Sequence, residues 1–462
     1  MKTIASTLVH IAPRWSSAIW VAASGFLVGC GAPVDSEGGT DLSAKSEELQ
    51  VGTVSQKVVW GISQALLDEH HAWHSGGRST TNTGKDFLIF HRNFLAKMAK
   101  EYRALGLPSE NMAPWTQVPS ELKTSALGWT STLANAETRL MTNNPPFANE
   151  NEFGMLVEST IHNWIHGAAA TKFNEPALGP IHTSPSSTFF FQIHGMVDLW
   201  WSRFLGAKLL QVTSSSNITQ DWTELNHSAL NNRPFARVMA TQNWRSFGPY
   251  NNHNVGVWFN GSTGRWAIYN EDGAAMTVGA AFNVQIEGGQ LTATAYSGNL
   301  GNTYVSFDHP LSTFFPSQRV WAMHNFNPPE ATSLFNPNST GVWFNGTKWA
   351  VFNESGVKPT NQSFNFLVQT ATDASRTDTA FTHTATSSNI SGQSTFISNS
   401  ATDGKSDARL IVTHNWNPTE DSPGTFNNHP IGVWFNGSKW AIFNEDLATM
   451  PVNASFNVIV QR

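Results

Sequence analysis

Histidines at helical spacing offer the clearest chemistry in this sequence. His162 and His166 lie four residues apart in a segment whose apolar periodicity predicts a helix, so both imidazoles face one side of it. His194 lies in a second apolar segment with the same periodicity. Neutral imidazoles gathered from two helices, with no cysteine or carboxylate among them, form a donor set that suits copper.

Two carboxylates flank these histidines. Glu158 precedes His162 by four residues, and Asp198 follows His194 by four, so each carboxylate lies one helical turn from an imidazole. Such a carboxylate can orient a metal ligand; an ordinary salt bridge or helix cap is the alternative for both. Asn163 stands where a zinc protease of this motif needs a glutamate general base, which excludes that class.

Helices must position these side chains. Apolar residues recur at helical spacing in four segments between about residues 58 and 210, and loops rich in proline, asparagine and serine separate them. The predicted helices span residues 60–73, 87–105, 149–170 and 187–205.

The order of the motifs resembles the tyrosinase family. The run ESTIHNWIH (158–166), followed by FQIHGMVDLW (191–200), is similar to the second copper motif of that family, and FLIFHRNFL (87–95) is similar to its first copper helix. The resemblance covers about residues 60–210. It implies a four-helix core that holds two copper ions, each by three histidines, and the oxidation of monophenols or diphenols to o-quinones with O2.

The resemblance also implies roles for individual residues. His162, His166 and His194 would bind the second copper, and Glu158 would be a catalytic-site residue that orients one of these ligands. Asp198 would orient a ligand from outside the coordination sphere. Asn163 matches the position where the family holds a water that assists phenol deprotonation; a local cap or hydrogen bond is the alternative for this side chain.

The first copper site departs from the family pattern. The family has a histidine nine residues before His91, where this chain has Asn82. His70 and His74 lie one helical turn apart upstream, which resembles the first copper site of arthropod haemocyanins. We expect His70, His74 and His91 to bind the first copper. His71 is the alternative to His70, since it also shares a face with His74, and an incomplete first site is the remaining alternative.

The N-terminus has the features of a bacterial export signal. A positively charged start and a short apolar run, AIWVAASGFLV, precede LVGC, which resembles the lipobox of a lipoprotein. Cys30 in that motif is the only cysteine, so an intrachain disulfide and a cysteine nucleophile are excluded. We expect a signal peptide over 1–29, a flexible tether over 30–55, and lipid anchoring at the outer membrane or cell surface; a core cysteine is the alternative.

The second half of the chain contains a threefold repeat. GVWFNG begins at residues 256, 341 and 432, and each copy is followed by a tryptophan-containing strand and then by FNV or FNF. An Asn-Gly turn between two aromatic-rich runs predicts a β-hairpin. The repeat resembles one found in bacterial secreted proteins without an assignable activity. Its aromatic residues would form the module cores; sugar or surface binding through an exposed tryptophan is the alternative.

These features predict a multi-domain chain that combines an α domain with an all-β region. A helical copper domain over 56–212 would be followed by three antiparallel β modules, over 236–290, 318–372 and 408–462. The formal net charge of −6 and the lack of a lysine or arginine run argue against a nucleic-acid partner.

The predicted function is a type-3 copper oxidase or monooxygenase. It would use two copper ions and O2 to oxidise a small phenol, a catechol or a peptide tyrosine, at a membrane to which its lipid anchors it. An O2 carrier of the same copper class is a weaker alternative. A surface-binding lipoprotein, whose β repeats carry the function and whose copper site is incomplete, is the alternative from a different class.

Overall fold

The computed structural model describes most of the chain after Val59. The described residues are 60–107, 109–245, 248–287, 291–296, 304–306, 316–329, 333–369, 379–418 and 424–461. The predicted signal peptide, Cys30 and the tether lie outside these ranges. Among the described residues, no helix combines the length and the apolar character needed to cross a membrane.

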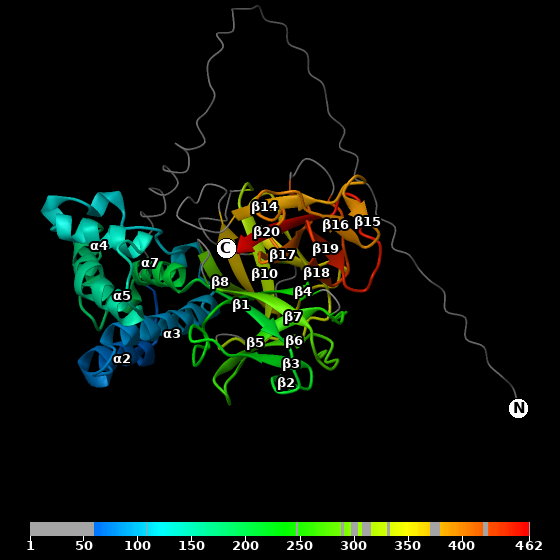
Figure 1. The fold of residues 1–462 in the computed structure, drawn as a ribbon. Helices are drawn as coiled ribbons and strands as arrows, with labels where there is room; N and C mark the ends of the chain where they lie inside the picture. Colours follow the sequence, from blue (N-terminus) through cyan, green and yellow to red (C-terminus); the bar gives the residue numbers. More distant parts are fainter. Residues whose placement is uncertain are drawn as a thin grey trace, which may run out of the picture. The chain divides into compact units, whose positions relative to one another are not determined.

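The N-terminal part of the described chain is helical, as predicted (Figure 1). Its helices are α2 (Gln64–Ala72), α3 (Thr83–Ala104), α4 (Ser131–Thr142), α5 (Glu150–Val157), α6 (Asn163–Lys172) and α7 (Thr188–Leu205). Each of the four predicted segments contains helix. Helix α4 was not predicted, although Thr130 caps its first turn by accepting a hydrogen bond from the Leu133 amide, an ordinary start signal.

Two of the predicted helices contain a wider, π-helical turn. The turn η2 (Trp73–Gly77) follows α2, and the turn η6 (Glu158–His162) joins α5 to α6. A π turn holds an extra residue, so the side chains after it are rotated relative to an uninterrupted α-helix. Such turns are frequent at functional sites. Here η2 contains His74, and η6 ends at His162.

Helices α3 and α5 cross at two glycines. A Cβ atom built on Gly154 would lie 2.0 Å from the Gly84 carbonyl oxygen, and one built on Gly84 would lie 2.3 Å from the Met155 amide nitrogen. Only residues without a side chain permit this approach. Beyond the crossing, Phe87 and His91 of α3 lie beside His162 of η6, with ring centroids 4.8 and 5.7 Å apart.

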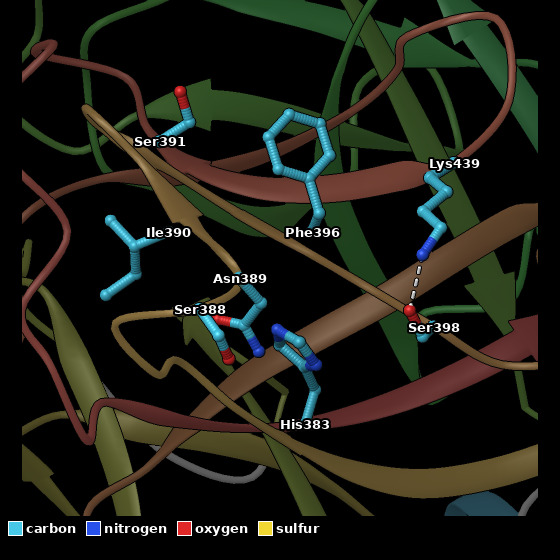
Figure 2. Close-up of a pocket in the computed structure, with 8 residues that line it drawn as sticks. All are labelled: His383, Ser388, Asn389, Ile390, Ser391, Phe396, Ser398 and Lys439. Carbon is cyan, nitrogen blue, oxygen red and sulfur yellow. Dashed lines mark hydrogen bonds between the residues drawn. The ribbon is translucent and has the colours of Figure 1, made fainter.

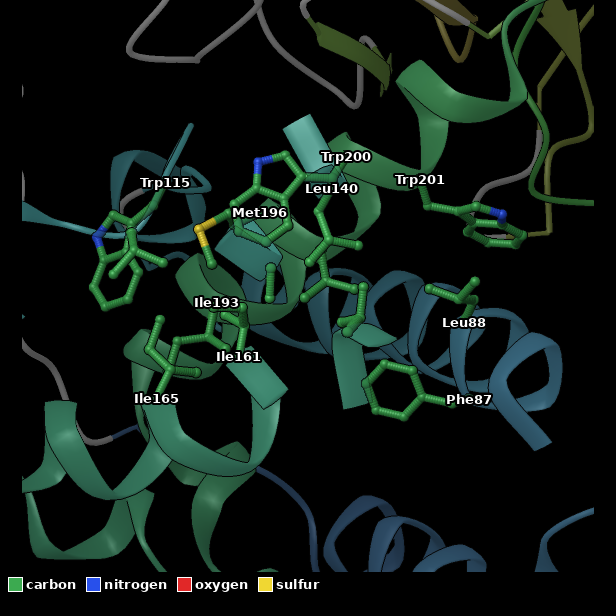
Figure 3. Packing of buried hydrophobic residues seen from close by; sticks show 14 of the residues in the cluster. Phe87, Leu88, Trp115, Leu140, Ile161, Ile165, Ile193, Met196, Trp200 and Trp201 are labelled. Atoms are coloured by element: carbon green, nitrogen blue, oxygen red, sulfur yellow. The ribbon is translucent and has the colours of Figure 1, made fainter. Parts of the chain in front are cut away.

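A shared apolar core holds these helices together. Phe87 on α3, Phe153 on α5, Ile161 on η6 and Trp200 on α7 are fully buried in one cluster, part of which Figure 3 shows. Burying a large apolar side chain stabilises a fold by about 1.5–3 kcal/mol. The core therefore fixes the relative positions of the helices that carry the histidines.

The C-terminal part of the described chain forms three β-sheets. The first consists, in spatial order, of β1 (Ala207–Val212), β7 (Ala281–Ile286), β4 (Val238–Trp244), β18 (Ile431–Phe435), β19 (Trp440–Asn444), β16 (Ser394–Phe396) and β15 (Ile390–Ser391). The second consists of β2 (Ile218–Thr219), β3 (Trp222–Leu225), β6 (Arg265–Asn270), β5 (Val255–Asn260), β10 (Arg319–Phe326), β13 (Ser363–Gln369) and β8 (Leu291–Tyr296). The third consists of β14 (Thr379–Thr384), β20 (Ser455–Gln461), β17 (Arg409–Asn415), β11 (Thr340–Phe344), β12 (Trp349–Asn353) and β9 (Tyr304–Ser306).

Every sheet is built from two different repeats. The predicted hairpins β5–β6, β11–β12 and β18–β19 are present and antiparallel. However, β5 also pairs with β10, β11 with β17, and β18 with β4, and all three of these pairs are parallel. Within each repeat the strand pairs are antiparallel, as expected, whereas the parallel pairs join different repeats, which the sequence did not predict. The paired strands come from different copies, so no tight turn forces them to run in opposite directions.

A buried asparagine in each repeat stabilises the pairing of strands from different repeats. Asn283, Asn365 and Asn457, the central residues of the FNV and FNF motifs, are fully buried. Each donates through Nδ2 to a backbone carbonyl of another repeat, on β17, β4 and β10 respectively, at 3.0, 3.1 and 2.9 Å. Because a buried amide must find such partners, the repeated motif helps to fix how the repeats join.

Candidate metal centre

Six histidines lie together among the helices. They are His70 on α2, His74 on η2, His91 on α3, His162 on η6, His166 on α6 and His194 on α7. These are the six residues that the sequence analysis selected as ligands. The α3–α5 crossing and the shared apolar core bring together elements that are up to 124 residues apart in sequence (His70 to His194).

The first group contains His70, His74 and His91. One ring nitrogen of each lies within 4.8 Å of the others, which is close enough for a single metal ion to bind all three. The wall beside them is aromatic, because the His70 ring stacks on Phe94 with ring centroids 5.2 Å apart, and Trp73 lies 5.2 Å from His91. The group can therefore hold a metal in surroundings that contribute few polar atoms.

The second group overlaps the first. Ring nitrogens of His91, His162 and His194 also lie within 4.8 Å of one another. His166 joins this group, since its Nε2 lies 3.1 Å from Nε2 of His194. His91 stacks on His194 with ring centroids 4.3 Å apart. The six imidazoles thus form one continuous cluster in which His91 is common to both metal-sized groups.

Backbone carbonyls orient three of the rings. Nδ1 of His70, His91 and His166 lies 2.9, 2.9 and 3.1 Å from the carbonyl oxygens of Ile181, Phe87 and Leu178 respectively. A ring that donates from Nδ1 leaves the Nε2 lone pair free, which is the usual arrangement of a metal-ligating histidine.

Several buried nitrogens of the cluster have no protein partner. Among the described groups, Nε2 of His70 and of His91 forms no hydrogen bond, and neither does Nδ1 of His162 or of His194. A buried polar atom without a partner costs free energy. A metal ion bound by these nitrogens would remove that cost, so the donor set fits a metal.

The cluster is electrically neutral at neutral pH. Burial lowers the pKa of His70 to about 3, of His74 to about 4 and of His166 to about 4. Burial, reinforced by neighbouring imidazoles, lowers the pKa of His91 and His194 well below 6.5. The same causes act on the pKa of His162. All six rings therefore keep an unprotonated nitrogen that can bind a metal cation.

The alternatives for the first site lie outside the cluster. His71 is exposed, and its ring lies 5.2 Å from that of His182. His182 is also exposed and lies 3.3 Å from the Asp68 carboxylate. Asn82 is exposed as well, at the start of α3 with a left-handed φ of 54°, a conformation that asparagine tolerates well. The structure thus groups His70, and not His71, with His74 and His91.

The two flanking carboxylates pair with arginines. Glu158 forms a salt bridge with Arg78 at 2.6 Å. Asp198 pairs with Arg92 and, at 3.0 Å, with Arg237. Burial alone would raise the pKa of Asp198, but the two guanidinium groups outweigh it and lower that pKa. These contacts correspond to the salt-bridge alternative of the sequence analysis.

The pairing of Asp198 belongs to a network that sequence reasoning missed. Arg92, which follows His91 directly, also contacts Glu287 at 2.8 Å. Glu287 is buried at the end of the first repeat and accepts a hydrogen bond from Ser202 on α7. The network ties α3 and α7 to the β region beside the histidines. Its partners are 39 to 195 residues apart, so local spacing gives no sign of it.

Asn163 lies at the solvent side of the cluster. The residue is exposed, whereas His162 before it is buried. The side chain of Asn163 slightly opposes the lowering of the His162 pKa that burial causes. Two histidines of the cluster, His74 and His166, are only partly buried.

Comparison with known proteins informs the β region. The model of one family, described as a domain of unknown function (DUF7452), matches the chain three times, at residues 206–286, 262–368 and 357–460. The predicted C-terminal repeat is thereby confirmed, while the helical region lies outside the matched residues. No curated protein and no solved structure matched the chain. Because the three matches together span more than half of its length, the chain belongs to the DUF7452 family.

Proposed function

We propose that the helical region binds two copper ions and oxidises phenols or catechols to o-quinones with O2. The observation that carries this proposal is the convergence of six neutral imidazoles from separate helices. His70, His74 and His91 would hold one ion. His162, His166 and His194 would hold the other. The resemblance of residues 60–210 to the tyrosinase family supports the same assignment.

Copper rather than another metal is proposed because the donor set contains only imidazole. Both metal-sized groups of ring nitrogens consist of histidine alone. Imidazole without thiolate or carboxylate suits copper in both oxidation states, although zinc and nickel also accept it. Bound copper would supply the redox chemistry with O2.

The chain itself would orient the ligands and the substrate. The carbonyls of Ile181, Phe87 and Leu178 fix three of the imidazole rings. The aromatic wall keeps water away from the buried side of the site. Asn163, exposed next to His162, is proposed to hold a water that accepts the phenol proton. Glu158 and Asp198 are proposed to act only indirectly, by anchoring the surrounding helices through their arginine partners.

A matched pair of adjacent variants tests the site. The chain loaded with Cu(II) should contain two coppers and oxidise catechol, tyramine or both. His70→Ala should lose at least one copper and the oxidase activity, whereas His71→Ala should keep both, because its exposed ring lies outside the cluster. The proposal is refuted if the parent binds no copper, or if His70→Ala oxidises catechol at the parent rate.

The alternative function is that of a surface-binding lipoprotein with an incomplete copper site. Asn82, which stands where the family has a histidine, favours this alternative. So does the 3.1 Å contact between Nε2 of His166 and Nε2 of His194, because two nitrogens that hydrogen bond to each other are not both free to bind a metal. A folded parent chain that binds one copper or none, without oxidase activity, would support this alternative.

We further propose that the protein is exported and anchored through a lipid on Cys30, at the outer membrane or cell surface. Growth with labelled palmitate should label the parent and leave Cys30→Ala unlabelled and released from the membrane fraction. Equal membrane association of both forms would refute this localisation.

A further inference from the structure

Each junction between two repeats carries four aromatic side chains at equivalent positions, here called an aromatic row. The first row is Phe335, Phe326, Trp258 and Trp222; the second is Phe426, Trp416, Trp343 and Tyr304; the third is Tyr250, Trp244, Trp434 and Phe396. Equivalent positions of the three repeats supply them. Each row combines strands of two consecutive repeats, or of the last and the first.

The ring spacing is regular along the rows. In the second row, successive ring centroids are 5.7, 5.8 and 5.7 Å apart. In the third row they are 5.4, 5.8 and 5.9 Å apart. In the first row the outer pairs are 4.5 and 5.5 Å apart. The outer ring contacts therefore recur at all three junctions, and the middle pair of the first row, Phe326 and Trp258, are partners in the parallel pairing of β10 with β5.

The rows reach the surface. Their terminal residues Tyr250, Phe335 and Phe426 are 41, 50 and 53% exposed. The other rings of the rows are partly buried. Single exposed apolar residues are common on proteins, but an exposed aromatic ring that continues a partly exposed aromatic row is a candidate binding site. Three equivalent groups on one chain strengthen that interpretation.

The third row leads into a polar cavity. Phe396 lines both the row and a cavity of about 590 Å³, shown in Figure 2. Ser388, Asn389 and Ser398 also line it. The one lysine in its wall, Lys439, donates to Ser398 at 2.6 Å. The cavity thus offers mainly neutral hydrogen-bonding groups next to an aromatic face.

We propose that the three rows bind chains of a neutral polysaccharide. A sugar ring presents apolar C–H faces, which pack on aromatic rings, and hydroxyl groups, which need neutral donors and acceptors such as those of the cavity. The net charge of −6 gives no attraction for an anionic polymer. This activity is separate from the proposed copper chemistry and would hold the enzyme on a surface.

Three equivalent sites would act together. A polymer bound at one row brings its neighbouring segments close to the other rows, so the binding becomes multivalent. Removing the exposed end of every row should therefore weaken retention by more than the loss of one contact would, and we expect a decrease of at least about tenfold.

Co-sedimentation of the full chain with swollen cellulose, colloidal chitin and insoluble xylan tests the proposal. The parent should be retained by at least one of them. The triple variant Tyr250→Ala/Phe335→Ala/Phe426→Ala should lose retention. The matched control replaces three valines that are 61, 56 and 53% exposed but lie outside the rows, as Val278→Ala/Val357→Ala/Val452→Ala, and should bind like the parent. Retention of the parent by none of the three polymers, or equal retention of both triple variants, overturns the proposal.

Misfolding and self-association are each tested by a separate measurement. Circular dichroism should show that both triple variants are folded. Sedimentation velocity should give the same mass for the parent and the aromatic variant; a parent oligomer that this variant dissociates would make the rows a protein interface and overturn the proposal. His166→Ala should keep polysaccharide binding, so failure of the copper proposal would leave this one intact.

Discussion

The crossing of α3 and α5 allows a sharp test of how the helices position the histidines. Gly154→Ala adds a single methyl group on α5, directly against the backbone of α3 at Gly84. His91 lies two turns after Gly84, and His162 lies eight residues after Gly154. A change in the crossing is therefore transmitted to histidines on both helices.

The size of the effect follows from the distances. The new Cβ would lie 2.0 Å from the Gly84 carbonyl oxygen, and ordinary contact begins at 3.4 Å, so the helices must separate by about 1.4 Å. A metal site tolerates displacements of about 0.5 Å. Overpacking of this kind costs about 1–3 kcal/mol. We therefore expect a folded protein of lower stability that has lost at least one copper.

Plasma mass spectrometry measures the copper content, and thermal unfolding followed by far-ultraviolet circular dichroism measures the loss of stability. Gly167→Ala is the matched control, because it lies beside His166 in α6 and its added Cβ would meet no atom within 4 Å. That variant should keep both coppers and gain up to about 1 kcal/mol from its better helix propensity. If Gly154→Ala retains the parent copper content and melting temperature, the positioning argument is wrong.

Three more predictions concern the network, the repeats and pH. Glu287→Ala removes a buried partner of an arginine and should destabilise the fold by about 3 kcal/mol, measured as a lower melting temperature; an unchanged value contradicts the network's role. Asn457→Ala leaves a buried carbonyl unpaired and should cost about 1–3 kcal/mol in urea unfolding, whereas parent-like stability would mean that the junctions do not need this amide. Burial lowers the pKa of His70 to about 3 and the pKa of His74 and His166 to about 4. In the metal-free protein, the unfolded chain therefore binds protons at these rings below about pH 6.5, whereas the folded chain binds them only near pH 4. Metal-free stability should thus be full above pH 6.5 and fall as the pH drops towards 4; a melting temperature constant over that range would refute the burial of neutral rings.

Local patterns were sufficient to predict most of the helices and the three hairpins, but not α4. Apolar residues at helical spacing located segments that become α2, α3, α5–α6 and α7, and the Asn-Gly turns located the three hairpins. The exchange of strands between repeats could not be predicted in this way. The three repeats have nearly the same strand sequences. The sequence therefore does not indicate which repeat supplies the partner of each strand.

The candidate site was predictable where the ligands follow helical spacing. His162 and His166 lie one turn apart and meet His194, although the π turns that precede or contain some ligands were not foreseen. Contacts between the helical region and the β region could not be predicted from the sequence. Arg92 finds Glu287 195 residues away, and nothing in the sequence near either residue encodes that contact.

Anomalous diffraction at the copper absorption edge, from crystals of the copper-loaded chain, would show where the metal binds. We expect two anomalous peaks inside the cluster, one bounded by His70, His74 and His91 and the other by His162, His166 and His194, with none at His71. A single peak, no peak within the cluster, or copper bound only at exposed histidines would contradict this expectation.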